Sequence, residues 1–162
     1  MNDLRLITGG FFLLKFTTFE QTINLTNTMI YTLCYVSKAA ENLNASSVED
    51  IFLTTQSNNT QKNISGILIY GMGNFFQVLE GEETVVEKLY EDYIKDDPRH
   101  SDIFEVIRRK TETPIFETYS SLFTIVKTTK QLEHIKAYLK QHRINSTGEK
   151  LGRLLNPFLL EL

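Results

Sequence analysis

The sequence contains a single cysteine, Cys34, among its 162 residues. A lone cysteine can form neither an internal disulfide nor a cysteine-rich metal site, and it suits a reducing compartment. We therefore expect a cytoplasmic protein. Because Cys34 falls at an outward-alternating position of a predicted strand, we expect it to pack as a small apolar side chain beneath a sheet.

Long apolar runs and a strong net charge are also missing. No stretch of the sequence approaches the roughly 20 apolar residues that a membrane-spanning helix needs. The formal net charge is −3, which gives no broad attraction to nucleic acid or to an anionic membrane. We therefore expect neither nucleic acid nor a membrane among the partners of this protein.

Motifs of conventional catalysis are absent as well. The three histidines show no metal-ligand spacing, and there is neither a phosphate-binding glycine loop nor a Gly-x-Ser-x-Gly elbow. The acid pairs at residues 82–83 and 96–97 are typical of solvated or capping carboxylates at turns. The sequence therefore predicts neither an enzyme nor a metal site.

What the sequence does have is the periodicity of one packed domain. Its apolar content of 41% suits a core rather than disorder. Alternating patterns predict strands at residues 29–36 and 64–70, a third after a hairpin turn at 71–74, and two more at 103–110 and 116–125. Capping-box pairs predict helices that start at Ser46 and Thr84, and Pro98 ends the second one.

This order of elements predicts a fold class. Two helices on one face of a five-stranded mixed sheet make a ferredoxin-like α+β sandwich. Such an arrangement leaves a slot between the two helices, with the sheet as its floor. A flat ligand in that slot would contact apolar side chains from both helices and would need polar groups at the helix ends.

One amide lies inside an apolar strand. Alternation puts Gln77 on the same strand face as Phe75 and Leu79. Burying an unpaired amide costs roughly 1–3 kcal/mol, so a buried Gln77 implies a hydrogen-bonding partner. Tyr35 is a candidate, because it falls at an inward position of the first predicted strand.

Two further polar segments lie near the ends of the predicted helices. Asn58 and Asn59 end the first helix, and by spacing alone they are helix caps or turn formers. His100 follows Arg99 at the start of a strand, where spacing alone makes it a surface or edge residue. The spacing by itself assigns none of these side chains to a ligand.

Together these segments resemble the BLUF (blue light using flavin) domain, a flavin-binding blue-light sensor. The resemblance runs from residue 30 to about residue 125, in the family's order and with nearly its spacing. The matching segments are Ile30-Tyr31-x-Leu33-x-Tyr35-x-Ser37, Asn58-Asn59, Ile64-Ser65-Gly66-Ile67-Leu68, Phe76-Gln77-Val78-Leu79-Glu80-Gly81 and Asp97-Pro98-Arg99-His100.

The resemblance implies a function and a set of site residues. It implies a noncovalently bound flavin, FAD with FMN as the alternative, and a photochemical switch made by Tyr35 and Gln77. In that switch an electron and a proton leave the tyrosine and the glutamine amide rearranges its hydrogen bonds. The implied cofactor-binding residues are Ser37, Asn58, Asn59, Ile64, Asp97, Arg99 and His100. The alternative is a light-inactive ferredoxin-like module that binds a ligand or a partner.

The sequence departs from the family pattern on the fifth strand. An aromatic residue followed two positions later by methionine is expected after Phe116, and these positions hold Tyr119 and Ser121. In the family this pair is associated with passing the flavin signal to the sheet. We therefore expect Tyr119 and Ser121 to form an altered signal relay.

A second departure lies in the second helix, which is one residue longer than usual. Where an arginine often faces the flavin, this sequence offers Asp92 or Tyr93. The extra residue also leaves Asp96 and Asp97 as competing flavin contacts. Asp97 is favoured because it keeps the Asp-x-Arg-His spacing.

Three segments are expected along the chain. Residues 29–125 form the flavin-binding domain, and residues 1–28 precede it as a disordered tail, an extra packed element or an artefact of start-site choice. Residues 126–162 form a helical cap that covers the bare face of the sheet or a partner surface. Because no room remains for a cyclase or phosphodiesterase domain, we expect signalling through an unidentified partner protein, and a homo-oligomer.

Overall fold

The computed structural model describes residues 29–116, 118–141, 146–160 and 162. The expectations for residues 1–28 fall outside this range. The elements, in chain order, are β1 (Ile30–Ala39), α1 (Ala45–Gln61), β2 (Ser65–Gly71), β3 (Asn74–Gly81), α2 (Glu83–Leu89), the π-helical turn η1 (Tyr90–Ile94), β4 (His100–Thr111), β5 (Thr124–Val126), α3 (Thr129–Gln141), α4 (Ser146–Leu154) and the 3-10 turn η2 (Pro157–Leu160).

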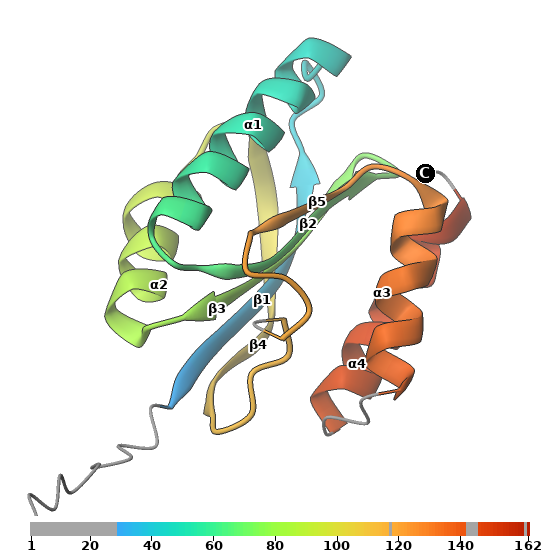
Figure 1. Ribbon diagram of the computed structural model, residues 1–162. Helices are drawn as coiled ribbons and strands as arrows, with labels where there is room; N and C mark the ends of the chain where they lie inside the picture. The colour runs from blue at the N-terminus through green and yellow to red at the C-terminus, as the bar shows by residue number, and fades with distance from the viewer. Residues whose placement is uncertain (1–28, 117, 142–145, 161) are drawn as a thin grey trace, which may run out of the picture.

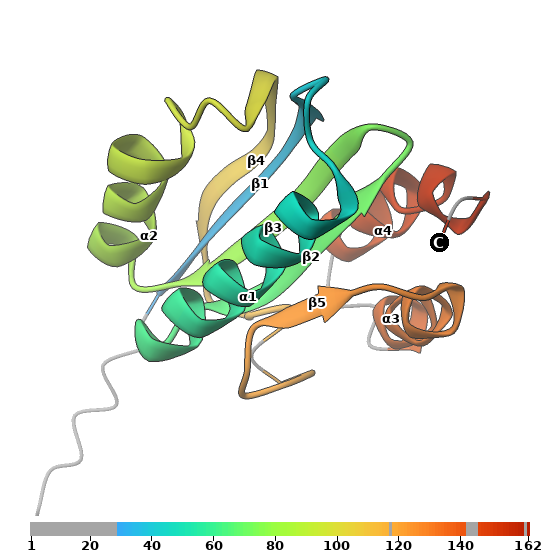
Figure 2. The same cartoon turned by 90° about the horizontal axis from the view of Figure 1, so that it is seen from above.

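The strands form one mixed sheet that lies between two layers of helices. Its order is β4-β1-β3-β2-β5, with β5 parallel to β2 and every other neighbouring pair antiparallel. Helices α1 and α2 cover one face, while α3 and α4 lie against the other (Figures 1 and 2). This confirms the ferredoxin-like α+β sandwich and the helical cap.

The alternation of side chains along the strands divides the core into two clusters. Leu33 and Tyr35 of β1 face α1 and α2 in the first cluster. Between them, Cys34 faces the second cluster, where it packs with Leu132 of α3 and Leu151 of α4. Cys34 is fully buried, and this burial raises the pKa of its thiol. The expected small apolar role beneath the sheet is confirmed.

Local chemistry explains where the structure agrees and disagrees with the expected turns and caps. The hairpin between β2 and β3 turns at Met72 and Gly73, whose φ angles of 55° and 68° suit a tight two-residue turn. The predicted start of α1 at Ser46 is wrong, because Asn44 caps the helix by accepting a hydrogen bond from Ser47 N at 2.9 Å. Thr84 likewise does not cap α2, which begins one residue earlier.

The second helix ends in the π-helical turn η1. There the amide of Lys95 donates to the carbonyl of Tyr90 at 2.9 Å, five residues back. A π turn accommodates one residue more than an α-helical turn. It therefore has room for the extra residue that the sequence predicts in this helix, and it lies beside the expected ligand slot.

The predicted fifth strand at residues 116–125 is wrong over most of its length, because β5 covers only Thr124–Val126. The carboxylate of Glu80 accepts from Ile115 N at 2.9 Å and from Phe116 N at 2.6 Å. These two amides are therefore not available to a strand ladder. As a consequence, Tyr119 and Ser121 precede β5 and do not lie on it.

Candidate functional site

A row of directly opposed residues crosses all five strands of the sheet. It runs from Glu105 of β4 to Tyr35 of β1 and Gln77 of β3, and on to Leu68 of β2 and Ile125 of β5. Opposed residues share one face of a sheet, and Tyr35, Leu68 and Ile125 belong to the cluster beneath α1 and α2. The row therefore places Tyr35 and Gln77 on the floor between the two helices.

The buried amide of Gln77 has the partner that its position implied. The hydroxyl of Tyr35 donates a hydrogen bond to Oε1 of Gln77, and the two residues are 4% and 3% exposed. Burial, and secondarily the neighbouring Tyr90 and Asp97, raise the pKa of Tyr35. Tyr35 therefore keeps its proton at neutral pH and remains a donor.

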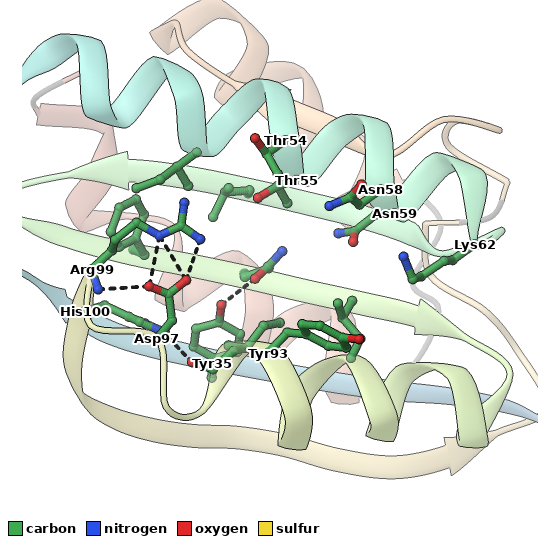
Figure 3. A pocket seen from close by; sticks show the side chains of 16 residues that line it. Tyr35, Thr54, Thr55, Asn58, Asn59, Lys62, Tyr93, Asp97, Arg99 and His100 are labelled. Carbon is green, nitrogen blue, oxygen red and sulfur yellow. Dashed lines mark hydrogen bonds and ion pairs between the residues drawn. The ribbon is translucent and has the colours of Figure 1, made fainter.

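A cavity of about 390 Å³ lies above this pair, between α1 and the helix formed by α2 and η1. Ligand sites usually measure roughly 300–1,000 Å³, so the space suits a small molecule. Its apolar lining includes Ile51 of α1, Leu89 of α2 and Ile94 of η1. The polar side chains on its walls are shown in Figure 3. The cavity therefore combines apolar helix walls with a hydrogen-bonding floor and ends, as the sequence predicted for a flat ligand.

Asn59 carries the clearest sign of a missing ligand. The residue is 2% exposed, and its Nδ2 has no hydrogen-bond partner among the described residues. An unpaired buried donor costs about 1–3 kcal/mol. Asn59 lines the cavity together with the exposed Asn58 (Figure 3), so an acceptor inside the cavity would satisfy it.

Asp97 and Arg99 form an ion pair at the opposite end of the cavity. The Arg99 Nε donates to Asp97 Oδ1 at 2.9 Å, and Nη2 lies 2.5 Å from Oδ2. Burial raises the pKa of Asp97, but the hydrogen bonds from Arg99 outweigh this and leave the pKa below its usual value. Asp97 lines the cavity and Asp96 does not.

His100 is fixed by hydrogen bonds on both ring nitrogens. Its Nε2 lies 2.7 Å from the carbonyl oxygen of Ile94, and its Nδ1 lies 2.7 Å from Oγ of Ser37. Because a carbonyl can only accept, Nε2 carries a proton, while Nδ1 and the serine hydroxyl share the second hydrogen bond. The ring, 6.0 Å from that of Tyr35 between centroids, is thereby held at the cavity wall.

The structure gathers most of the predicted site residues but not all of them. Ser37 lies behind His100, and Ile64 lies in the adjacent core, so neither lines the cavity. The backbone amide of Ile64 donates to the Asn59 carbonyl at 2.9 Å, which ties it to the end of α1. Tyr119 lies on the other side of the sheet, with its ring 4.9 Å from that of Tyr138 in α3.

Several residues at the cavity were not predicted from the sequence. Thr54, Thr55 and Lys62 of the α1 wall line it (Figure 3). Helical spacing from Ile51 to Asn58 places the two threonines on the same helix face, and that pattern could have found them. Of the two candidates in the second helix, Tyr93 lines the cavity and Asp92 does not.

Two other kinds of site can be addressed for the described part of the chain. Among these residues there is no group of three or more histidine, cysteine, aspartate or glutamate side chains placed to hold a metal ion. No helix within the described ranges is both long enough and apolar enough to cross a membrane.

The fold and the cavity together define a ferredoxin-like module with a cavity between two helices, lined by apolar walls and by polar side chains at its floor and ends. The family model described as sensors of blue-light using FAD matches residues 30–122. The chain belongs to this family, the BLUF domains, which are flavin-binding blue-light sensors and not catalysts. This confirms the resemblance seen in the sequence.

Related sequences are light-regulated proteins. Photoactivated adenylate cyclase subunit beta of Euglena gracilis is 31% identical over 65% of this chain. The blue light- and temperature-regulated antirepressor BluF of Escherichia coli is 34% identical over 49%. The chain spans only 12% and 19% of the length of these relatives.

Solved structures of BLUF proteins superpose on most of the chain. The photo-activated state of BlsA has 28% identity and a TM-score of 0.59, covering 83% of this chain and 97% of that one. The BLUF domain of BlrP1 has 29% identity and a TM-score of 0.63, covering 81% and 90%. The structure titled Klebsiella pneumoniae BlrP1 with FMN and cyclic diGMP has 28% identity and a TM-score of 0.63, covering 82% and 36%.

Proposed function

We propose that this protein is a blue-light photoreceptor that binds FAD noncovalently and switches through Tyr35 and Gln77. The observation that carries the proposal is the buried hydrogen bond from Tyr35 to Gln77 on the floor of a cavity. Its wall holds Asn59, whose Nδ2 has no partner among the described residues. FAD is chosen over FMN because the family description names it.

The residues of the cavity suit a flavin. Its ring would lie between the apolar walls of α1 and α2, with the amides of Asn58 and Asn59 at one end and Asp97, Arg99 and His100 at the other. Asn59 Nδ2, which has no partner among the residues that the structure describes, would donate to a ring carbonyl. Ser37 and Ile64 act from behind, because Ser37 bonds the His100 ring and Ile64 bonds the Asn59 backbone.

When bound, the flavin supplies a photoexcited acceptor for one electron. Tyr35 gives up an electron from its ring and a proton from its hydroxyl, whose hydrogen bond leads to Gln77. The Gln77 amide offers an acceptor and a donor on opposite atoms. Turning it exchanges the two and gives a second satisfied hydrogen-bond network, which is the bistable element that a switch needs.

We propose that the signal leaves through the face of the sheet opposite the cavity. Glu80, three residues after Gln77 in β3, holds the backbone of Ile115 and Phe116. The Tyr138 hydroxyl of α3 bonds the Ile115 carbonyl at 2.7 Å. The segment with Tyr119 and Ser121 follows directly, so these two residues would relay the change to α3.

The receiver would be a separate signalling protein or a second copy of this chain in the cytoplasm. The buried, unpaired thiol of Cys34 suits such a reducing compartment. The helical cap and the segment that carries Tyr119 and Ser121 are the surfaces on which such a protein would detect the change.

The experiment is light-minus-dark absorption spectroscopy of the purified protein. Native protein should carry flavin and show a reversible red shift under blue light. Tyr35→Phe should keep the flavin but lose the shift, because only the hydroxyl is removed. A normal shift in Tyr35→Phe would overturn the switch, and native protein that cannot take up flavin would overturn the proposal as a whole.

A further inference from the structure

A second tyrosine packs against Tyr35. Tyr90, the first residue of η1, is 1% exposed, and its ring centroid is 5.8 Å from that of Tyr35. The ring belongs to the same core cluster. Tyr90 is not among the residues that line the cavity, so it would act on a ligand only through Tyr35.

The two hydroxyls have different surroundings. Tyr35 donates to Gln77, whose neutral amide oxygen is a poor proton acceptor. The Tyr90 hydroxyl interacts with the carboxylate of Glu105, which after burial is the largest cause that raises the pKa of Tyr90. Glu105 is also the residue directly opposite Tyr35 in β4. Tyr90 therefore has a charged proton acceptor that Tyr35 lacks.

Because a cation lies above the Tyr90 ring, oxidation of Tyr90 needs an acceptor for its proton. The Arg108 guanidinium carbon lies 5.7 Å from the ring centroid, and Arg108 also pairs with Glu87 at 3.0 Å, with Glu91 at 3.1 Å and with Glu105 at 3.4 Å. A positive charge on the ring would be repelled by this guanidinium. Oxidation of Tyr90 is therefore favourable only if its proton leaves together with the electron.

We propose that Tyr90 is a second electron donor, which returns an electron to oxidised Tyr35 while its own hydroxyl proton passes to Glu105. This inference rests on the proposed photochemistry of Tyr35. In this reaction Tyr90 gives the electron and Glu105 takes the proton, and the reaction competes with switching by Tyr35 and Gln77.

Tyr35 would first lose one electron to the bound flavin after excitation, and its hydroxyl proton would pass along the hydrogen bond to Gln77 and on to the same acceptor, because the neutral amide does not hold it. Tyr90 then gives one electron to Tyr35 and its O–H bond breaks, with the proton forming an O–H bond on Glu105. Tyr35 regains its own proton from the flavin through Gln77, so the net result is a neutral tyrosyl radical at Tyr90, a neutral Glu105 and one electron left on the flavin. Return of that electron to Tyr90, with return of the proton from Glu105, reverses these changes.

This transfer has a consequence for the switch. Once the oxidised site has moved to Tyr90, Tyr35 and Gln77 are back in their starting hydrogen bond. Each such event ends without rearrangement of the amide. Tyr90 therefore lowers the yield of the switched state for each absorbed photon.

The test is transient infrared spectroscopy of flavin-loaded protein with isotope-labelled tyrosine rings. We expect tyrosine oxidation to decay in two phases in the native protein, and Tyr90→Phe to lose the slower phase and to form more red-shifted state per photon. Glu105→Gln should lose the same phase, because it keeps the size of the side chain but removes the proton acceptor. Circular dichroism of the flavin-free variants checks that each one folds.

Matched controls separate this role from a structural one. Tyr31→Phe removes another hydroxyl that Arg108 contacts, at 2.9 Å, and Glu91→Gln removes another carboxylate paired with Arg108; both should keep the slow phase. Identical decay in native protein and Tyr90→Phe overturns the inference while leaving Tyr35 as the switch. If Tyr90→Phe does not fold, unchanged decay in Glu105→Gln overturns it. Loss of the proposed function itself is recognised separately, by a normal shift in Tyr35→Phe.

Discussion

The two faces of the sheet bury polar side chains in opposite ways. On the face under α1 and α2, Gln77 and Asn59 border a cavity, and Asn59 Nδ2 has no partner among the described residues. On the face under α3 and α4, the buried carboxylate of Glu80 accepts from Thr32, Ile115 and Phe116. The same strand, β3, therefore contributes to an incomplete hydrogen-bond network on one side and to a complete one on the other.

This difference indicates which face can change. A complete network in a packed core has one low-energy arrangement, because any movement leaves a buried group unpaired. A network that a ligand completes can have more than one arrangement, as the amide of Gln77 illustrates. The face under α1 and α2 is therefore suited to switch between hydrogen-bond arrangements. The face under α3 and α4 keeps its hydrogen bonds and is suited to transmit a displacement as a rigid unit.

The largest expected effect comes from removing the carboxylate of Glu80, which completes the hydrogen-bond network on the face under α3 and α4. Glu80→Ala leaves two backbone amides, those of Ile115 and Phe116, without their acceptor in the core. At about 1–3 kcal/mol for each unpaired donor, we expect a loss of about 2–6 kcal/mol in the free energy of unfolding. Chemical denaturation of the flavin-free protein measures it.

Glu80→Gln is the matched variant for this prediction. It keeps one acceptor oxygen but sets an NH₂ group against the amides, so its loss should be smaller than that of the alanine variant. A change below 1 kcal/mol in both variants would contradict the view that Glu80 holds this face together.

Next in size is the removal of the hydrogen bond on the cavity face. Gln77→Leu takes away the acceptor of the buried Tyr35 hydroxyl, for an expected loss of about 1–3 kcal/mol. The protein should fold and keep its flavin, because the helix walls remain, but it should lose the red-shifted state. Denaturation and light-minus-dark spectra measure the two parts. Failure to fold would make Gln77 structural, and a retained shift would place the switch elsewhere.

The sequence was sufficient to predict the layers of the fold. Alternation assigned Cys34 and Tyr35 to opposite faces, and the pattern of residues 126–162 predicted the cap. It could not locate the start of β5, because that depends on Glu80 reaching backbone amides 35 and 36 residues away. A contact that distant leaves no local pattern.

The residues of the site were likewise predicted only in part from the sequence. Tyr35 and Gln77 were paired by the physical requirement that a buried amide needs a partner. The roles of Ser37 and Ile64 depend on bonds to His100 and Asn59 that only the folded chain brings together. The position of Tyr90 against Tyr35 could not be predicted, since nothing in its spacing reveals a second tyrosine ring beside it.

A smaller effect on stability is expected from removing the Asn59 amide, which lines the cavity on the face under α1 and α2. Asn59→Ala removes an amide whose Nδ2 is unpaired, so the free energy of unfolding of the flavin-free protein should change by less than about 1 kcal/mol. Flavin binding should weaken by roughly 2- to 10-fold, the equivalent of one hydrogen bond of about 0.5–1.5 kcal/mol. Equilibrium dialysis of flavin measures this change.

The exposed neighbour gives the control for that prediction. Asn58→Ala should have the smaller effect on binding, because water can replace its hydrogen bonds. If Asn59→Ala strongly destabilised the flavin-free protein while leaving flavin affinity unchanged, Asn59 would be a structural residue like Glu80.

The smallest expected effect is a pH dependence at the rim of the cavity. Arg99 holds the pKa of Asp97 below its usual value despite the opposing effect of burial, so Asp97 binds its proton less readily in the folded state than in the unfolded one. Its stabilising contribution is therefore present above the unfolded pKa of about 3.9 and is lost as the pH falls through the lower folded value. Arg99 is 48% exposed, so solvent limits the contribution to about 1 kcal/mol at most. Native protein should exceed Asp97→Asn in stability at pH 7, and the difference should disappear on acidification. A native advantage over Asp97→Asn that stays constant down to the acid limit would show that Asp97 acts through packing and not through its charge.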